Sequence, residues 1–311
     1  MRVFVVGDVS VDLIYLLDRL PEPGEEVVAK RMLYRPGGAA ATVAAQLASL
    51  GHTVFLASRV GSGPLSAIAL EGLKKAGVDL RHLQQDPEHP TTNVLVFVFP
   101  GGERSMVASA GASRELDARE FKPRFLDTMD ALVVSAYALV GGPQREYAVK
   151  AMAAAKKREV PIFVDLGTGA VRQGGRDLIP TLRTADYVLM NQDELLELTG
   201  KSSISEAIAE LRKEGIERVV IKVGPLGAIV ATPEEEALVE PFEVDEVVDT
   251  TGAGDAFTAG FVHGVLSGKS LTEAARIGNI AGALATTAVG AQGRLVTLDD
   301  LKAAESSPAK A

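Results

Sequence analysis

The stretch VVDTTGAGDAFTAGF, residues 247–261, follows a β-branched run with two threonines, then places glycines at 252 and 254 around an alanine. Asp255 comes next, at the start of an apolar segment with helical spacing. A glycine-rich turn that opens a helix presents backbone N–H groups at the positive end of the helix dipole, where phosphate binds well. We therefore expect a phosphate-binding turn here.

Asp255 cannot bind phosphate itself, because like charges repel. Its carboxylate can instead accept the proton of a hydroxyl that attacks phosphorus. The alternative is that Asp255 only complements the helix dipole and that the glycines only permit a turn. The spacing alone leaves both interpretations open.

The rest of the chain alternates short apolar runs with helical patterns, which is typical of an α/β fold with a doubly wound, mainly parallel sheet flanked by helices. The strand-like runs are RVFVVG, TVFLASRV, ALVVSA, PIFVDL, DYVLMN and RVVIKVG. The expected helices cover about residues 38–50, 65–76, 144–158, 205–214, 253–266 and 271–289. In such sheets ligands bind beyond the carboxyl ends of the strands.

Two segments, about 12–36 and 91–110, have strand-like alternation without an intervening helix, and the second contains the turn Pro100-Gly101-Gly102. They predict hairpins that form a small β-sheet lid over one edge of the main sheet. We expect residues 1–311 to form a single domain with this lid. An exposed lid edge favours a homodimer formed through the lid.

Composition excludes several classes of function. The chain has 311 residues, a formal net charge of −9 and no Lys/Arg run with interleaved aromatics, so we expect no nucleic-acid partner. It has no cysteine, which excludes disulfides and thiolate chemistry. We find no signal peptide and no uninterrupted apolar run of membrane length, so we expect a cytoplasmic protein without a membrane partner.

Other phosphate motifs do not fit. GVLSGKS at 264–270 is one residue too short for a Walker A loop and follows a helix instead of a strand. GAGDAF lacks the last glycine of a dinucleotide fingerprint, which argues against a nicotinamide dehydrogenase.

The segment DTTGAGDAFTAGFV, residues 249–262, resembles the C-terminal signature of the ribokinase-like, or phosphofructokinase B (PfkB), family of carbohydrate kinases. The resemblance continues in order over nearly the whole chain. It implies a ribokinase-like fold, an ATP-dependent sugar kinase and Mg²⁺ as cofactor. It also implies that Asp255 is the general base and that the amides of Gly252, Ala253 and Gly254 form the anion hole.

The sugar end of the site is implied by two further segments. GDVSVD is similar to the opening of the family, in which the second acid, here Asp12, binds sugar hydroxyls. PGGAAATVAAQLASLG resembles the N-terminal signature, with Gly37 and Gly38 matched and Thr42 in place of the usual asparagine. Threonine offers one hydroxyl instead of an amide pair.

The nucleotide end is implied by three segments. NQDELLELTG matches the N-x-x-E element, in which Glu194 orients Mg²⁺ through water, although Asn191 and Glu194 also have the spacing of a capping box. VIKVGPLGAIV is similar to the nucleotide edge of the family or is a plain hairpin turn. The helix ARIGNIAGALATTAVG would form a wall of the adenine pocket or only pack in the core. The candidate residues in the second and third segments are Lys222, Gly224, Gly227, Asn279 and Gly282.

Family members often hold a monovalent cation beside the anion hole, which implies K⁺ near Asp249, Thr251 and Gly290. Arg104 on the lid is a candidate substrate ligand or a solvated charge of the hairpin. Asp165 at a strand end is either an active-site residue or a cap.

The interpretation that follows is an ATP-dependent kinase acting on a pentose, hexose or sugar acid. The alternatives are a nucleoside kinase of the same family and a non-catalytic sugar or nucleotide sensor. A nucleoside kinase needs an aromatic side chain that stacks on the base, and aromatic residues are only 5% of this chain.

Overall fold

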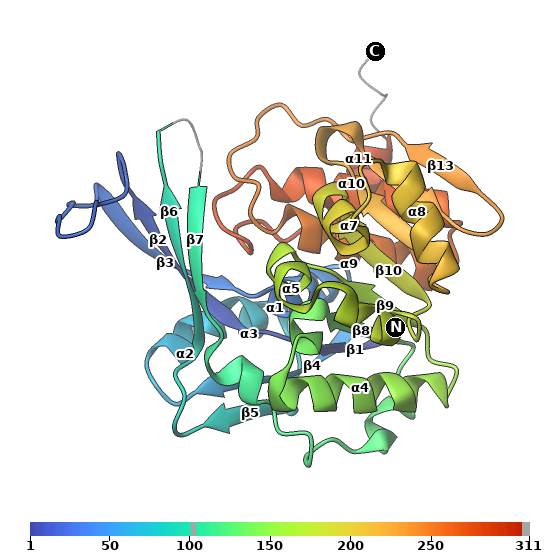
Figure 1. Cartoon of the computed structure of the whole chain (residues 1–311), viewed down its shortest axis with the longest axis horizontal. Helices are drawn as coiled ribbons and strands as arrows, with labels where there is room; N and C mark the ends of the chain where they lie inside the picture. The colour runs from blue at the N-terminus through green and yellow to red at the C-terminus, as the bar shows by residue number, and fades with distance from the viewer. Residues whose placement is uncertain (101–103, 307–311) are drawn as a thin grey trace.

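The computed structural model describes residues 1–100 and 104–306, which build a large sheet of nine strands and a small sheet of four (Figure 1). Across the large sheet the strands are β13 (Glu236–Val239), β12 (Ala228–Ala231), β11 (Val219–Lys222), β10 (Tyr187–Asn191), β9 (Ile162–Asp165), β8 (Ala131–Ser135), β1 (Arg2–Val6), β4 (Thr53–Gly61) and β5 (Leu83–Asp86). Strands β11, β12 and β13 pair antiparallel, and the other neighbours pair parallel.

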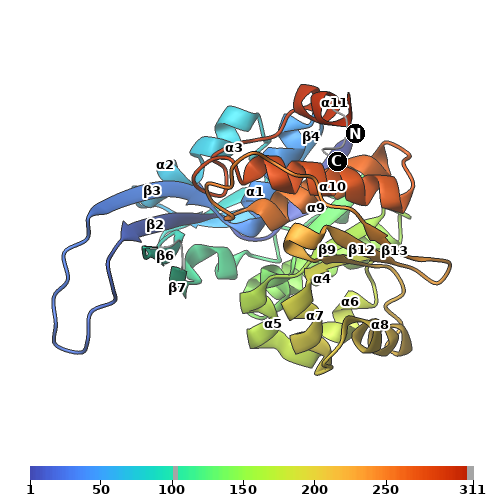
Figure 2. The same ribbon diagram turned by 90° about the horizontal axis from the view of Figure 1, so that it is seen from above.

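Helices cover both faces of the large sheet (Figure 2). One face carries α1 (Ala39–Ser49), α3 (Glu71–Ala76), α9 (Ala253–Leu266) and α10 (Leu271–Ala285). The other carries α4 (Gly142–Lys156), α5 (Thr168–Gly174), α6 (Ile179–Leu182), α7 (Gln192–Thr199) and α8 (Ile204–Lys213). The expected class, a doubly wound and mainly parallel α/β sheet, is confirmed.

The small sheet stands apart from this body and has the order β3-β2-β6-β7 (Figure 1). Its strands are β2 (Ser10–Leu16), β3 (Arg31–Gly37), β6 (Thr92–Val98) and β7 (Arg104–Ser109). The strands within each hairpin, β2–β3 and β6–β7, pair antiparallel. The two hairpins are joined by the parallel pairing of β2 with β6. Gly101 and Gly102 of the expected turn lie outside the described residues.

Two expected helices differ from the structure. The helix expected at 65–76 is two short helices, α2 (Leu65–Ala69) and α3, which meet at Leu70. The last long helix ends at Ala285 instead of Val289, because the hydroxyls of Thr286 and Thr287 bond back to helix carbonyls. The carbonyl of Thr286 then accepts the amides of Val248 and Asp249 at 2.8 and 3.0 Å. The end of α10 thus anchors the segment before α9.

Helix α9 is fixed to the sheet by aromatic packing. The Phe261 side chain is fully buried, and its ring packs edge-on against Phe163 and Tyr187, with centroid separations of 6.4 and 5.9 Å. Such contacts are favourable beyond the area that they bury. The position of the α9 N-terminus therefore depends on this core.

Truncating this side chain should destabilise the protein strongly. We expect Phe261→Ala to lower the free energy of unfolding by about 3–5 kcal/mol, because the lost ring leaves a cavity under α9. Leu226→Ala, at a residue 66% exposed, is the control and should change it by less than about 0.5 kcal/mol. Urea unfolding followed by circular dichroism measures both, and similar losses in the two variants would contradict the packing described.

Candidate active site

Polar residues gather where the parallel strands end. Asp8 follows β1, Asp165 ends β9 and Lys222 ends β11, so the three lie along one edge of the sheet. The Ser135 hydroxyl, at the end of β8, donates to Asp8 Oδ1 at 3.1 Å. This bond spans β1 and β8, the point at which the strand order reverses. Ligands of open α/β sheets bind at such a point.

The glycine-rich turn leads directly into α9. Gly252 has a φ of 79°, and a Cβ on it would stand 2.6 Å from the Ala291 carbonyl oxygen, so only glycine fits. The Ala253 amide donates to the Thr250 carbonyl at 3.3 Å. The amides of Gly254 and Asp255 belong to the first turn of α9, where N–H groups have no acceptor within the helix.

Asp255 is partly buried in this first turn. Burial raises its pKa well above the ordinary value, the carboxylates of Asp165, Asp8 and Asp12 raise it further, and Lys222 opposes them. A carboxylate in such surroundings is a stronger base than one in water. The site therefore offers a proton acceptor beside backbone donors.

The residues expected at the sugar end lie together. Asp12 on β2 is only 7% exposed, and a Cβ on Gly37 would collide with its carboxylate. Gly38 precedes α1 with a φ of 96°, and a Cβ there would stand 2.7 Å from the Asp8 carbonyl oxygen. The glycine pair thus lets α1 begin directly against these two acids.

Thr42 lies one turn into α1 and is 1% exposed. Its hydroxyl oxygen is buried and has no hydrogen-bond partner among residues 1–100 and 104–306. Buried polar groups are usually paired with protein, water or ligand. A role for Thr42 in binding sugar stays a prediction.

Two residues of this edge were not predicted. The Asp8 carboxylate accepts the Ala39 amide at 2.9 Å and so caps α1 from a distant strand. The Tyr137 hydroxyl accepts the Gly169 amide at 3.3 Å, and burial, followed by the charge of Asp8, raises the pKa of Tyr137 to about 12. Asp8 is the first acid of GDVSVD and could have been suspected, whereas no local motif marks Tyr137.

Asn191 and Glu194 form the capping box of α7. The Asn191 Oδ1 accepts the Glu194 amide at 2.8 Å, and Glu194 Oε2 accepts the Asn191 amide at 2.9 Å. The other carboxylate oxygen accepts the Thr168 hydroxyl at 3.1 Å. The capping interpretation is therefore correct, and it fixes the Glu194 carboxylate at the edge of the sheet.

The segment with Lys222, Gly224 and Gly227 is a hairpin between β11 and β12, which agrees with the plainer of its two interpretations. Gly227 has a φ of 93° and packs against the Val239 carbonyl, where a Cβ would collide. The Lys222 side chain leaves the hairpin and forms an ion pair with Asp165 at 2.7 Å. The Lys222 ammonium therefore lies under α9 and not beside the hairpin turn at Gly224 and Gly227.

A cavity of about 1100 Å³ lies between the segment 238–248 and helix α10. Asn279 lines it and donates to the carbonyls of Val239 and Glu240 at 3.1 and 2.7 Å. Gly282 packs instead under α9, since a Cβ on it would stand 3.1 Å from the Ala253 carbonyl oxygen. Of the two residues expected on the adenine wall, the structure places only Asn279 in the cavity.

Asp249, Thr251 and Gly290 form one cluster. Asp249 accepts the Thr251 amide and hydroxyl at 2.9 and 2.7 Å and the Gly290 amide at 2.8 Å. Burial alone would raise the pKa of Asp249, but these hydrogen bonds and the charge of Arg104 lower it. The cluster therefore carries a negative charge beside the glycine-rich turn.

Arg104 at the start of β7 reaches this cluster from the small sheet. Its guanidinium donates to the hydroxyls of Thr250, at 3.2 Å, and Thr251, and it lies 3.6 Å from Asp249 Oδ1. The small sheet thus contacts the turn before α9 across the site.

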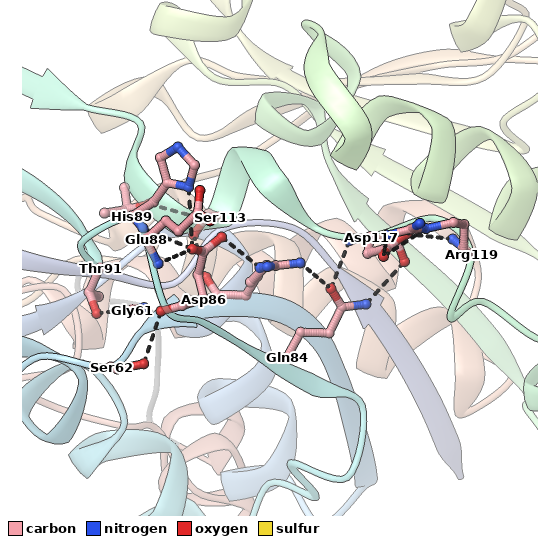
Figure 3. Close-up of polar contacts among 12 residues, drawn as sticks. Gly61, Ser62, Gln84, Asp86, Glu88, His89, Thr91, Ser113, Asp117 and Arg119 are labelled. Carbon is pink, nitrogen blue, oxygen red and sulfur yellow. Dashed lines mark hydrogen bonds and ion pairs between the residues drawn. The ribbon is translucent and has the colours of Figure 1, made fainter.

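The root of the small sheet is held by a polar network at the ends of β4 and β5 (Figure 3). Asp86 accepts the amides of Glu88 and His89 at 2.8 Å and forms an ion pair with Arg59 at 2.8 Å. The Thr91 hydroxyl accepts the Gly61 amide at 3.1 Å, directly before β6 begins. The small sheet therefore joins the large one through fixed hydrogen bonds.

The buried carboxylate of Asp12 should lower the free energy of unfolding at neutral pH. Burial raises its pKa from 3.8 to about 6, and the charges of Asp8 and Asp249 add to this effect. The folded state thus binds more protons than the unfolded state between pH 4 and 6, so stability falls as pH rises through this range. We expect Asp12→Asn to raise the free energy of unfolding by about 2–3 kcal/mol at pH 7 and by little at pH 4.

Denaturant unfolding at the two pH values measures this effect. Asp18→Asn, at an exposed lid residue, is the control and should be nearly neutral at both. An equal or lower stability of Asp12→Asn at pH 7 would contradict the proposed cost of burying this charge.

Comparisons with known proteins identify relatives over nearly the whole chain. The sequence pattern of the family described as "pfkB family carbohydrate kinase" matches residues 1–298. A fructokinase from Escherichia coli is 33% identical, with 97% of this chain and 98% of that protein covered. The structure of Arabidopsis thaliana ribokinase complexed with ribose and ATP has a TM-score of 0.86 and 25% identity, covering 98% of this chain and 99% of that chain.

The adenosine kinase from Sinorhizobium meliloti is also similar, with a TM-score of 0.85, 25% identity and 97% and 98% of the two chains covered. The resemblance noted in the sequence is thereby confirmed, and the chain belongs to the pfkB family of carbohydrate kinases.

Proposed function

We propose that the protein transfers the γ-phosphoryl group of ATP to a hydroxyl of a small sugar, with Asp255 as the general base. The observation that carries this proposal is the partly buried Asp255 carboxylate, with its raised pKa, in the first turn of α9, where the amides of Gly254 and Asp255 have no acceptor within the helix. A base and an anion-binding turn must lie together for a hydroxyl to attack a phosphoryl group.

The acceptor sugar would bind on Asp12 and the turn Gly37-Gly38. A carboxylate accepts hydrogen bonds from neighbouring hydroxyls and discriminates against compounds that lack them. The buried hydroxyl of Thr42, which has no partner in the described part of the chain, supports a further contact, direct or through water. The similarity to a fructokinase and a ribokinase supports a hexose or a pentose as acceptor.

The adenine end of ATP would occupy the cavity beside Asn279, between the apolar side chains of Phe242, Ile280 and Leu284. Val248 lines the same cavity, and the chain continues from it directly into the turn before α9. The nucleotide would thus extend from the cavity to the amides of Gly252, Ala253 and Gly254, with the hairpin at Gly224 and Gly227 beside it.

Mg²⁺ fits this arrangement with few protein ligands. The described part of the chain has no group of three His, Asp or Glu side chains that could hold a metal by itself. Glu194 has a fixed carboxylate, and it would bind water molecules of the metal while ATP supplies phosphate oxygens. When bound, Mg²⁺ would neutralise charge on the phosphoryl oxygens.

K⁺ would bind near Asp249, Thr251 and Gly290, where the lowered pKa of Asp249 keeps a carboxylate ionised. Arg104 already lies against this carboxylate, so the cation and the guanidinium would compete for its charge. Arg104 would then be free to reach the transferred phosphate or the sugar. Closure of the lid over the sugar would exclude water as a competing acceptor.

Asp255→Asn tests the central assignment. We expect kcat to fall by about 10²- to 10⁴-fold, because the hydroxyl loses its proton acceptor, while binding of MgATP is retained. The assay follows ADP formation, with Mg²⁺ and with or without K⁺, over pentoses, hexoses, sugar acids, sugar phosphates and nucleosides. Asp299→Asn, at a side chain 92% exposed, is the control and should keep wild-type turnover.

The panel also separates the alternatives. Turnover on nucleosides alone would make the protein a nucleoside kinase of the same family, and ATP binding without turnover on any acceptor would favour a sensor. A kcat near the wild-type value in Asp255→Asn would overturn the assignment of the base.

We further propose that two copies associate through the small sheet, to give a homodimer. Tyr34, Leu13, Leu95 and Val107 stand side by side across its four strands, so they share one face. Tyr34 and Val107 are 45% and 58% exposed. Among the described residues, the outer strands β3 and β7 each pair with a strand on one side only, and an apolar face on such a sheet favours association.

Replacing one of these side chains with a charge should prevent association. We expect the wild type to sediment as a dimer and Val107→Lys as a monomer, because a charge on the face would have to be buried. Val28→Lys, at a residue 84% exposed between β2 and β3, is the control and should remain dimeric. Sedimentation velocity decides, and a monomeric wild type would refute the proposal.

A further inference from the structure

A buried ion pair lies under the first turn of α9. Lys222 and Asp165 end strands β11 and β9, which flank β10, and their side chains are only 14% and 5% exposed. The Lys222 Nζ donates to Asp165 Oδ1 at 2.7 Å. The pair therefore bridges the end of the intervening strand.

The pair is fastened to α9 on both sides of Asp255. The fully buried Thr258 donates its hydroxyl to Asp165 Oδ2 at 2.8 Å. The Lys222 ammonium lies 3.4 Å from the Gly254 carbonyl oxygen and 3.4 Å from Thr258 Oγ1. Gly254 precedes Asp255 directly and Thr258 follows it by three residues, so these bonds limit rotation and displacement of the turn that carries Asp255.

Asp165 and Lys222 also belong to the set of charged groups around Asp255. The titratable groups that act on it, or that it acts on, come from five elements: Asp8 after β1, Asp12 on β2, Tyr137 after β8, Asp165 on β9 and Lys222 on β11. Of these, only Lys222 carries a positive charge. Burial opposes the charge of Lys222, but the carboxylates of Asp165 and Glu194 raise the pKa of Lys222, so it stays protonated.

We propose that the Asp165–Lys222 pair, tied to α9 through Thr258, is a positioning device that holds Asp255 in place and sets how readily it takes up a proton. Neither side chain has to touch a substrate for this role. The proposal rests on the proposed function of Asp255 as general base. It gives a functional reason for an ion pair whose burial costs desolvation free energy.

The test separates the two charges. In Asp165→Asn the carboxylate that opposes ionisation of Asp255 is gone while Lys222 stays, so the pH midpoint of Asp255 should fall by about one unit. In Asp165→Asn/Lys222→Met the ammonium is also gone, and the midpoint should rise again relative to the single variant. Opposite shifts from opposite charges are not expected from a purely structural role.

Two readouts keep the inference distinct from the proposed function. The first is carboxyl ¹³C NMR of protein labelled at Asp Cγ, with the Asp255 signal assigned by its absence in Asp255→Asn. The second is the acid limb of kcat/KM with the acceptor found in the panel. A protein without kinase activity would refute the proposed function, yet the NMR titration would still test the electrostatic coupling.

The surface pair Asp186–Lys156, at 3.2 Å, provides the matched control. Asp186→Asn and Asp186→Asn/Lys156→Met make the same chemical changes away from α9 and should leave the Asp255 midpoint unchanged. An Asp255 midpoint that is the same in wild type, Asp165→Asn and the double variant would overturn the proposal.

Should Asp165→Asn fail to fold, Thr258→Val decides, because it keeps both charges and removes only the Thr258 hydroxyl, which bonds to Asp165 and lies 3.4 Å from the Lys222 ammonium. We then expect kcat to fall about 10-fold, with the KM for ATP unchanged within twofold, since a displaced base slows the chemical step more than nucleotide binding. A wild-type kcat in folded Thr258→Val would refute the positioning role.

Discussion

Repulsion among carboxylates is the constraint on which the rest of this site depends. A parallel sheet brings the ends of its strands to one edge, and here the strands and the segments after them place Asp8, Asp165 and Glu194 there, while Asp12 comes from β2 of the small sheet. Asp249 and Asp255 join them from the segment that opens α9. Several carboxylates close together in a poorly solvated site cannot all remain ionised unless cations or hydrogen-bond donors offset their repulsion.

The fold compensates these carboxylates unequally. Asp8 receives the amide that opens α1, Asp249 receives three donors, and Asp165 receives the ammonium of Lys222. Burial also raises the pKa of Asp165, although its ion pair with Lys222 opposes this effect. Asp12 and Asp255 have no ion-pair partner among the described residues, and burial raises the pKa of each above its ordinary value. These two acids are the ones proposed to bind and to deprotonate the acceptor. The cost of ionising a carboxylate is therefore highest where a bound ligand would supply hydrogen-bond donors.

Local features of the site could be predicted from the sequence, and long-range ones could not. The start of α9 follows from Gly252 and Gly254, and the capping box of Asn191 and Glu194 follows from a spacing of three residues. The bond between Lys222 and Asp165 joins residues 57 apart, and Asp8 caps a helix 31 residues away. No local pattern specifies such pairs, because they depend on which strands become neighbours in the sheet.

The parallel pairing of β2 with β6 was missed for the same reason, and it joins the two hairpins into one sheet of four strands. Successive side chains of a strand point to opposite faces, so β2 directs Asp12 toward the site and Leu13 toward the apolar face. A shift of one residue in its register would exchange the two. The register of β2 against β3 and β6 therefore places Asp12 on one face of the small sheet and Leu13 on the other.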